Sequence, residues 1–130
     1  MRNWIGSVLT GAAILAASPA IAGLSSAEKR MTTAVDAEYE RSVSLLERLV
    51  NQNSGSLNLA GVEAVGQMMR AELEPLGFAV MWKPMALAHR SGHLIAIHKG
   101  NAGGKKLLLI AHLDTVFEKD SPFQTFVRRG

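Results

Sequence analysis

A histidine and an aspartate two residues apart, His112 and Asp114, are the side chains of this sequence best placed to do chemistry. In an extended segment, residues two apart point to the same side, roughly 6.5 Å apart along the backbone, so the carboxylate can turn back toward the imidazole. One ring nitrogen can then bind a metal or accept a hydrogen bond while the other donates to the carboxylate, which fixes the tautomer. The pair could form half of a metal site but not a whole one, because a catalytic zinc normally takes about three protein ligands and keeps one open position.

The segment before this pair is strongly apolar. Residues 107–111 read Leu-Leu-Leu-Ile-Ala, with two glycines shortly before them. Such a run is typical of a strand buried on both faces of a sheet. It predicts a central strand over residues 106–111 of an α/β domain, and ligands of open α/β sheets bind beyond the carboxyl ends of the strands, where His112 falls.

The chain upstream of residue 77 has a helical period. Apolar residues recur at steps of three and four between residues 31 and 50, and capping boxes at Ser25 or Thr33 leave the start of this first helix open. A polar loop follows, and Asn58 can cap a second helix that Pro75 and Gly77 end.

After Gly77 the period becomes alternating. It predicts two paired strands at residues 78–84 and 94–99, joined by a loop or wide hairpin connection over residues 85–92. Three histidines lie in this region and invite a metal interpretation, but their spacing is not that of ligands, which favours solvent-facing or edge positions. They are His89, His93 and His98.

Residues 1–22 have the pattern of a secretory signal peptide. Arg2 supplies the positive start, an uncharged apolar stretch follows, and Ala20-Ile21-Ala22 is a cleavage site. An uncleaved membrane anchor is the alternative, but the apolar run is shorter than the ~20 residues of a membrane span. We therefore expect cleavage after Ala22 and a secreted or periplasmic protein with no stable membrane anchor.

Composition bounds the remaining possibilities. Without Arg2 the chain has 13 Lys and Arg against 11 Asp and Glu, and the two signs are interleaved, so we expect no nucleic-acid partner. There is no cysteine, so the exported domain does not depend on disulfides. The 130 residues suffice for one domain.

The motif Ala-His-Leu-Asp-Thr-Val at 111–116, after a Leu-rich run and before Pro122-Phe123, resembles the first metal-binding motif of the co-catalytic zinc exopeptidases. These include glutamate carboxypeptidase (carboxypeptidase G), acetylornithine deacetylase and succinyl-diaminopimelate desuccinylase. The polar loop at 53–58 and the Leu-Gly-Phe at 76–78 match the same order of elements, so the resemblance covers about residues 36–126.

This resemblance implies that His112 is a zinc ligand and that Asp114 is its catalytic partner, which orients it. It implies two zinc ions in a complete enzyme, which hydrolyses a C-terminal amino acid from a peptide or N-acyl amino acid, and a homodimer is possible. It also implies the N-terminal portion of a three-layer catalytic domain over residues 23–130. The family's bridging aspartate, Glu-Glu pair and other ligands are expected downstream, so we expect a truncated chain that is inactive alone.

Two classes of function remain open from the sequence. The first is the zinc-dependent metallocarboxypeptidase, to which this chain gives the first ligand. The second is an exported non-catalytic domain or inert truncated fragment, in which His112 and Asp114 make a structural hydrogen bond. Apolar surface is expected wherever further chain would pack, and with it poor solubility.

Overall fold

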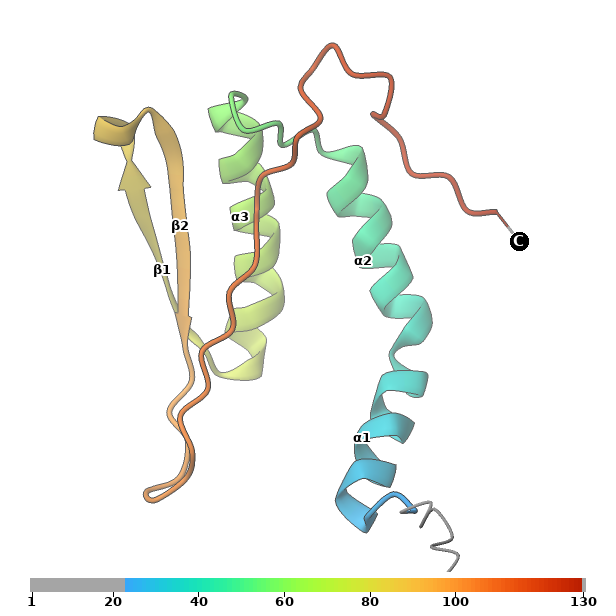
Figure 1. Cartoon of the computed structure of the whole chain (residues 1–130). Helices are drawn as coiled ribbons and strands as arrows, with labels where there is room; N and C mark the ends of the chain where they lie inside the picture. Colours follow the sequence, from blue (N-terminus) through green and yellow to red (C-terminus); the bar gives the residue numbers. More distant parts are fainter. Residues whose placement is uncertain (1–22, 130) are drawn as a thin grey trace, which may run out of the picture. The chain divides into compact units, whose positions relative to one another are not determined.

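The computed structural model describes residues 23–129, and the predicted signal peptide at residues 1–22 lies outside them. Within that range the chain forms three α-helices and one two-stranded antiparallel sheet (Figure 1). The chain divides into two units between Val35 and Asp36. The mixture of helix and sheet agrees with the predicted α/β class, whereas the predicted three layers are not formed by residues 23–129.

The first helix, α1, spans Ser26–Ala37. Its start settles the choice between the two capping boxes in favour of Ser25. The backbone nitrogen of Ser25 donates to Oε2 of Glu28 at 2.7 Å, and the nitrogen of Glu28 donates to the Ser25 hydroxyl at 3.3 Å. No helix among residues 23–129 is long and apolar enough to cross a bilayer.

A second helix, α2, spans Tyr39–Asn51, so the single helix predicted through residue 50 is in fact two. The backbone of Glu38, with φ −93° and ψ 3°, leaves the helical region between them. The apolar spacing of three and four residues continues through Glu38, so periodicity alone does not reveal the break between the two helices.

Helix α3 spans Leu59–Leu73 and carries the core of the molecule. The Asn58 side chain accepts from the Gly61 nitrogen at 3.3 Å, which confirms the predicted cap. A short 3₁₀ turn at Glu74–Leu76 follows, and Gly77 ends it with φ 85°, a conformation that glycine adopts without strain. The buried hydrophobic side chains of the described residues are two valines of this helix, Val62 and Val65, each 6% exposed.

The predicted strand pair is confirmed as the hairpin of β1, Ala79–Met85, and β2, Arg90–Ile97. The connection is shorter than predicted, a 3₁₀ turn at Ala86–Ala88 followed by His89 at φ 52°. The hairpin packs against α3, where a Cβ on Gly66 would lie 2.7 Å from the ring of Trp82. Glycine at that position therefore lets the indole lie on the helix.

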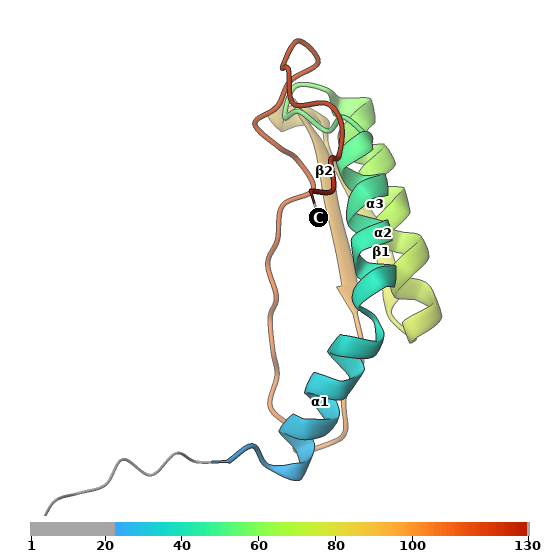
Figure 2. The same ribbon diagram turned by 90° about the vertical axis from the view of Figure 1, so that its right-hand side faces the viewer.

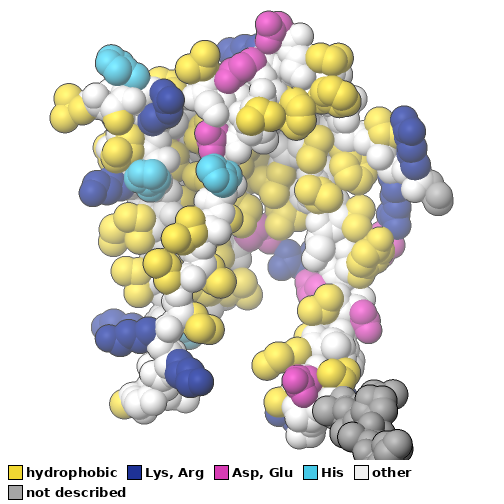
Figure 3. Space-filling view, in the orientation of Figure 1, with side chains coloured by type: hydrophobic (Ala, Val, Ile, Leu, Met, Phe, Trp, Pro, Cys, Tyr) yellow, Lys and Arg dark blue, Asp and Glu magenta, His cyan; other side chains and the backbone are white. Residues whose placement is uncertain are grey.

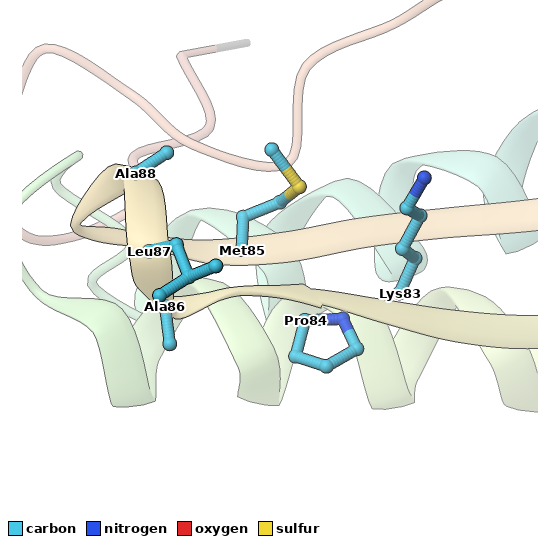
Figure 4. A pocket seen from close by; sticks show the side chains of 6 residues that line it. All are labelled: Lys83, Pro84, Met85, Ala86, Leu87 and Ala88. Carbon is cyan, nitrogen blue, oxygen red and sulfur yellow. The ribbon is translucent and has the colours of Figure 1, made fainter.

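The apolar tip of the hairpin forms a shallow pocket lined by residues 83–88 (Figure 4). Lys83 and Met85 point to one side of the ribbon and Pro84 to the other, as alternation along a strand requires. Neither His112 nor Asp114 lines this pocket.

The prediction of a buried central strand at residues 106–111 is wrong for this structure. The segment has no strand pairing and runs as a plain tube in two views (Figures 1 and 2). Its apolar side chains are between 83% and 92% exposed, and hydrophobic side chains gather on the surface in Figure 3. The apolar run is compatible with a buried strand, but no strand of residues 23–129 pairs with it and no layer covers it.

Candidate functional site

His112 and Asp114 form the hydrogen-bonded pair that their spacing predicts. Nδ1 of His112 lies 3.1 Å from Oδ1 of Asp114. An ionised carboxylate only accepts hydrogen bonds, so this contact is a hydrogen bond when Nδ1 carries a proton. In the neutral ring with that proton on Nδ1, Nε2 keeps its lone pair. The imidazole is 88% exposed, and Nε2 makes no hydrogen bond with residues 23–129. This is the form in which a histidine can bind a divalent metal through Nε2.

The other oxygen of Asp114 is held by a residue 58 positions earlier in the chain. The hydroxyl of Ser56 donates to Oδ2 of Asp114 at 2.6 Å, a short bond of the kind made to a charged acceptor. The same hydroxyl lies 3.3 Å from the carbonyl of Thr115. The carboxylate therefore has one partner on each oxygen, the imidazole and the serine hydroxyl.

Backbone pairing holds the two segments together at this point. The nitrogen of Ser56 donates to the Thr115 carbonyl at 3.1 Å, and the nitrogen of Thr115 donates to the Ser54 carbonyl at 2.9 Å. Gly55 and Thr115 form an isolated parallel bridge between these bonds. Ser54 is only 4% exposed, so the bridge is shielded on the loop side. This backbone pairing sets the position of Ser56 along the segment that contains Asp114, so that the Ser56 hydroxyl lies beside the carboxylate.

Asn53 connects the loop to the chain beyond the motif. Its Nδ2 donates to the Phe117 carbonyl and to Oε1 of Gln124, both at 2.9 Å. Its Oδ1 accepts from the Gly55 nitrogen at 3.3 Å and from Nδ2 of Asn58 at 2.9 Å. One amide side chain thus links the loop, the cap of α3 and the segment after Asp114.

Glu118 supplies a second link on the opposite side of the loop. Its Oε1 accepts from the backbone nitrogen of Leu57 at 3.0 Å. Glu118 also lines a shallow depression with Leu57, Asn58, Lys119 and Asp120. The sequence interpretation assigned Glu118 no role, and its contact makes it a support of the loop.

The electrostatics of the pair favour the charged carboxylate. The hydrogen bond from Ser56 lowers the pKa of Asp114 below its ordinary value, and the bond from His112 lowers this pKa further. Partial burial acts in the opposite direction and is outweighed. Asp114 is therefore ionised at neutral pH and remains an acceptor for the Nδ1 proton.

The other histidines do not join this site. His98 packs against Phe78, with ring centroids 5.1 Å apart, and His89 lies in the turn between the strands. Nowhere in residues 23–129 do three His, Cys, Asp or Glu side chains gather as a metal site would require. The described donors thus fit one zinc ligand with its orienting carboxylate and do not by themselves fit a closed zinc site.

Sequence reasoning missed Ser56 and Asn53 as parts of this arrangement. From the sequence, the polar stretch at residues 51–58 is predicted to be a loop, and no contact with the motif is predicted for it. Its contacts with Asp114 and with residues 117–124 span 58 to 71 positions. The available signal was the run of Asn and Ser residues itself, because such side chains bond to the backbone and to neighbouring loops.

Comparison with known proteins shows that the chain is similar to a carboxypeptidase. The chain is 35% identical over 113 residues to carboxypeptidase G2 of Pseudomonas sp. (strain RS-16). The match takes in 85% of this chain and 27% of the relative, so the chain spans about a quarter of that protein's length. No family model matches the chain, and no solved structure matches it. By this resemblance the chain is related to a carboxypeptidase, which agrees with the resemblance in its sequence motif.

Proposed function

We propose that this chain carries the first metal-binding motif of a zinc-dependent carboxypeptidase, with His112 as a ligand through Nε2 and Asp114 as the residue that orients it. The observation that carries the proposal is the 35% identity to carboxypeptidase G2 over 113 residues. The hydrogen bond of 3.1 Å between the two side chains supports the assigned roles, because metal-bound histidines usually donate their other ring proton to such an acceptor.

The proposed reaction is hydrolysis of the amide that links a C-terminal amino acid, such as glutamate, to a peptide or acyl group. Bound zinc, expected as two ions, polarises the scissile carbonyl and lowers the pKa of a bound water. Residues 23–129 contribute His112 as one ligand and Asp114 as its support. The further ligands and the general base are proposed to lie in other residues, so residues 23–130 alone should bind zinc weakly and hydrolyse no amide.

The proposed fold is the N-terminal part of a three-layer α/β catalytic domain. Helix α3 and the β1–β2 hairpin would form one side, and residues 106–111 would become the central strand once strands lie on both sides of it. The exposure of 83% or more at residues 107–110 supports this proposal, because such a run of apolar side chains is normally covered.

The decisive experiment grafts this chain in place of the matching quarter of carboxypeptidase G2. Zinc content and release of glutamate from an acyl-glutamate are measured on the chimera and on its variants. His112→Ala should lose metal and activity together, and Asp114→Asn should keep part of its metal and lose activity by about 10- to 100-fold. His93→Ala removes an imidazole from β2 and is the matched control, expected to leave both quantities unchanged.

Full activity and full zinc content in the His112→Ala chimera would overturn the ligand assignment. Tight stoichiometric zinc binding with turnover by residues 23–130 alone would overturn the prediction that other residues complete the site. If the chimera folds and binds no zinc at His112, the alternative of a non-catalytic exported domain is favoured, with the pair making a structural hydrogen bond.

Export of the protein is proposed from the pattern at residues 1–22. Expression of the full chain in a Gram-negative bacterium should give periplasmic or secreted material that begins at Gly23. Material with an intact Met1, detected by N-terminal sequencing, would contradict the proposed cleavage.

A further inference from the structure

The Ser56 hydroxyl is the feature of this site that neither the motif nor the proposed chemistry uses. It donates to Oδ2 of Asp114 at 2.6 Å, while Oδ1 of the same carboxylate lies 3.1 Å from Nδ1 of His112. Two hydrogen bonds therefore connect the three side chains in the order Ser56 hydroxyl, Asp114 carboxylate, His112 imidazole. Ser56 makes no hydrogen bond to His112 itself within the described residues, so any effect on the imidazole passes through Asp114.

A carboxylate with a single partner would be poorly oriented here. The terminal torsion of aspartate is broad, so one hydrogen bond leaves the plane of the carboxylate free to turn. The imidazole is 88% exposed, so packing does not fix the ring, and Asp114 is only partly covered, with 35% of its side chain exposed. To hold the plane of the Asp114 carboxylate, this geometry requires a second donor of fixed position that bonds to Oδ2.

Ser56 can be that donor because its own position is set by backbone bonds. The Ser56 nitrogen bonds the Thr115 carbonyl at 3.1 Å, and the Thr115 nitrogen bonds the Ser54 carbonyl at 2.9 Å. These two bonds hold the residue after Asp114 against the residues around Ser56. The hydroxyl therefore meets Oδ2 without a long flexible side chain between them.

We propose that Ser56 is a positioning residue, whose hydroxyl holds Asp114 so that the imidazole of His112 carries its proton on Nδ1 and presents Nε2. This rests on the proposed function for its consequence, because Nε2 is the nitrogen that would bind the metal. The geometry itself does not depend on a metal.

The test is the tautomer of His112 in the full chain, read from ring ¹⁵N shifts by NMR at one pH near 8, where histidine is neutral. The wild-type ring should be mainly the Nδ1–H form. Ser56→Ala should move the population toward the Nε2–H form, and Ser56→Thr, which keeps a hydroxyl, should restore it. Ser91→Ala is the matched control, because it removes a 2.7 Å hydroxyl bond to the Leu59 carbonyl away from Asp114.

Two results would overturn the proposal. One is a wild-type His112 that is mainly Nε2–H, which needs no variant and so does not depend on whether Ser56→Ala folds. The other is an unchanged tautomer in a folded Ser56→Ala chain, since a merely structural hydroxyl would leave the imidazole as it was.

The zinc measurements on the chimera separate this proposal from the proposed function. A tautomer shift in Ser56→Ala, with zinc content unaffected by His112→Ala, would support the positioning role and refute the metal role. An unchanged tautomer in Ser56→Ala, with zinc lost in His112→Ala, would support the metal role of His112 and refute the positioning role of Ser56. If both proposals hold, Ser56→Ala in the chimera should weaken zinc binding by about 10-fold.

Discussion

Gly55 lies where the loop before α3 meets Glu118, and the contact leaves no space for a side chain. A Cβ on Gly55 would meet Oε2 of Glu118 and would lie 2.7 Å from its Cα, which is a backbone atom and cannot swing aside. Gly55 is also the partner of Thr115 in the parallel bridge beside Asp114. The absence of one methyl group thus allows the loop to approach the motif.

Gly55→Ala should therefore separate the loop from Thr115 and lower the free energy of unfolding by about 1–3 kcal/mol, as overpacking of a close contact does. Urea denaturation measures this loss, and amide exchange at Thr115 reports the broken bridge. Gly100→Ala is the control, because no atom lies within 4 Å of its added Cβ. Equal stability of the two variants would show that the loop and Glu118 are not in contact in solution.

At the scale of elements, ion pairs and hydrogen bonds connect segments that share little buried surface. Glu72 of α3 pairs with Arg41 and Arg48 of α2, each at 2.7 Å. Near the end of the chain, Arg128 makes two bonds of 2.9 Å to Glu40 of α2. Such pairs near the surface contribute little to stability individually, and these connections should weaken as the salt concentration rises.

The Glu40 contact gives a pH prediction with a definite sign. The hydrogen bond from Arg128, and then its positive charge, lower the pKa of Glu40 in the folded chain. A lowered carboxyl pKa means that the stabilisation is fully present above the unfolded value, about 4.3 for Glu, and is lost as the pH falls through the folded value. The contact between Arg128 and Glu40 should therefore form at neutral pH and be lost in acid, when Glu40 becomes protonated.

A ¹³C NMR titration of the Glu40 carboxyl measures this pKa directly. Arg128→Ala should raise it, and high salt should reduce the difference between the two proteins, because both side chains are largely exposed. Arg129→Ala is the neighbouring control and should leave the Glu40 titration unchanged. If the titration midpoint of Glu40 is the same in the wild type and in Arg128→Ala, the two side chains are not in contact in solution.

At the scale of the whole molecule, residues 107–110 are the longest consecutive run of exposed large apolar side chains among residues 23–129. Four consecutive large apolar side chains are at least 83% exposed, and their backbone has no strand partner among residues 23–129. Exposed apolar segments with unpaired backbone groups are sites of association with other chains. This agrees with the apolar surface predicted from the sequence.

The isolated chain should accordingly self-associate as its concentration rises and should bind the dye ANS. Replacing Leu108 and Ile110 by lysine should reduce both, as measured by sedimentation velocity and fluorescence. Leu87→Lys changes an equally exposed leucine at the hairpin tip and should have a smaller effect. In the carboxypeptidase chimera the double lysine variant should instead fail to fold, because charges would be buried in the proposed central strand.

The sequence by itself determined the features that depend on neighbouring residues. The cap at Asn58, the end of the helical region at Gly77 and the strand pair near residues 79–97 all follow from local spacing and turn chemistry. The bond between His112 and Asp114 belongs to this group, because side chains two apart in an extended segment point to the same side. Periodicity missed the break at Glu38, where helical spacing continues across a change in the backbone, and it placed the start of the second strand after Arg90.

Only the tertiary structure decided which distant groups meet. Nothing in the spacing of Ser56 and Asp114, 58 positions apart, indicates that a 2.6 Å bond joins them. The fate of residues 106–111 is of the same kind, because an apolar run has the composition of a buried strand but becomes one only when other strands supply its hydrogen bonds and another layer covers its side chains. Helix caps, turns and strand propensity depend on residues that are consecutive in the sequence. Strand pairing and side-chain burial depend on which distant segments of the chain pack against a given segment.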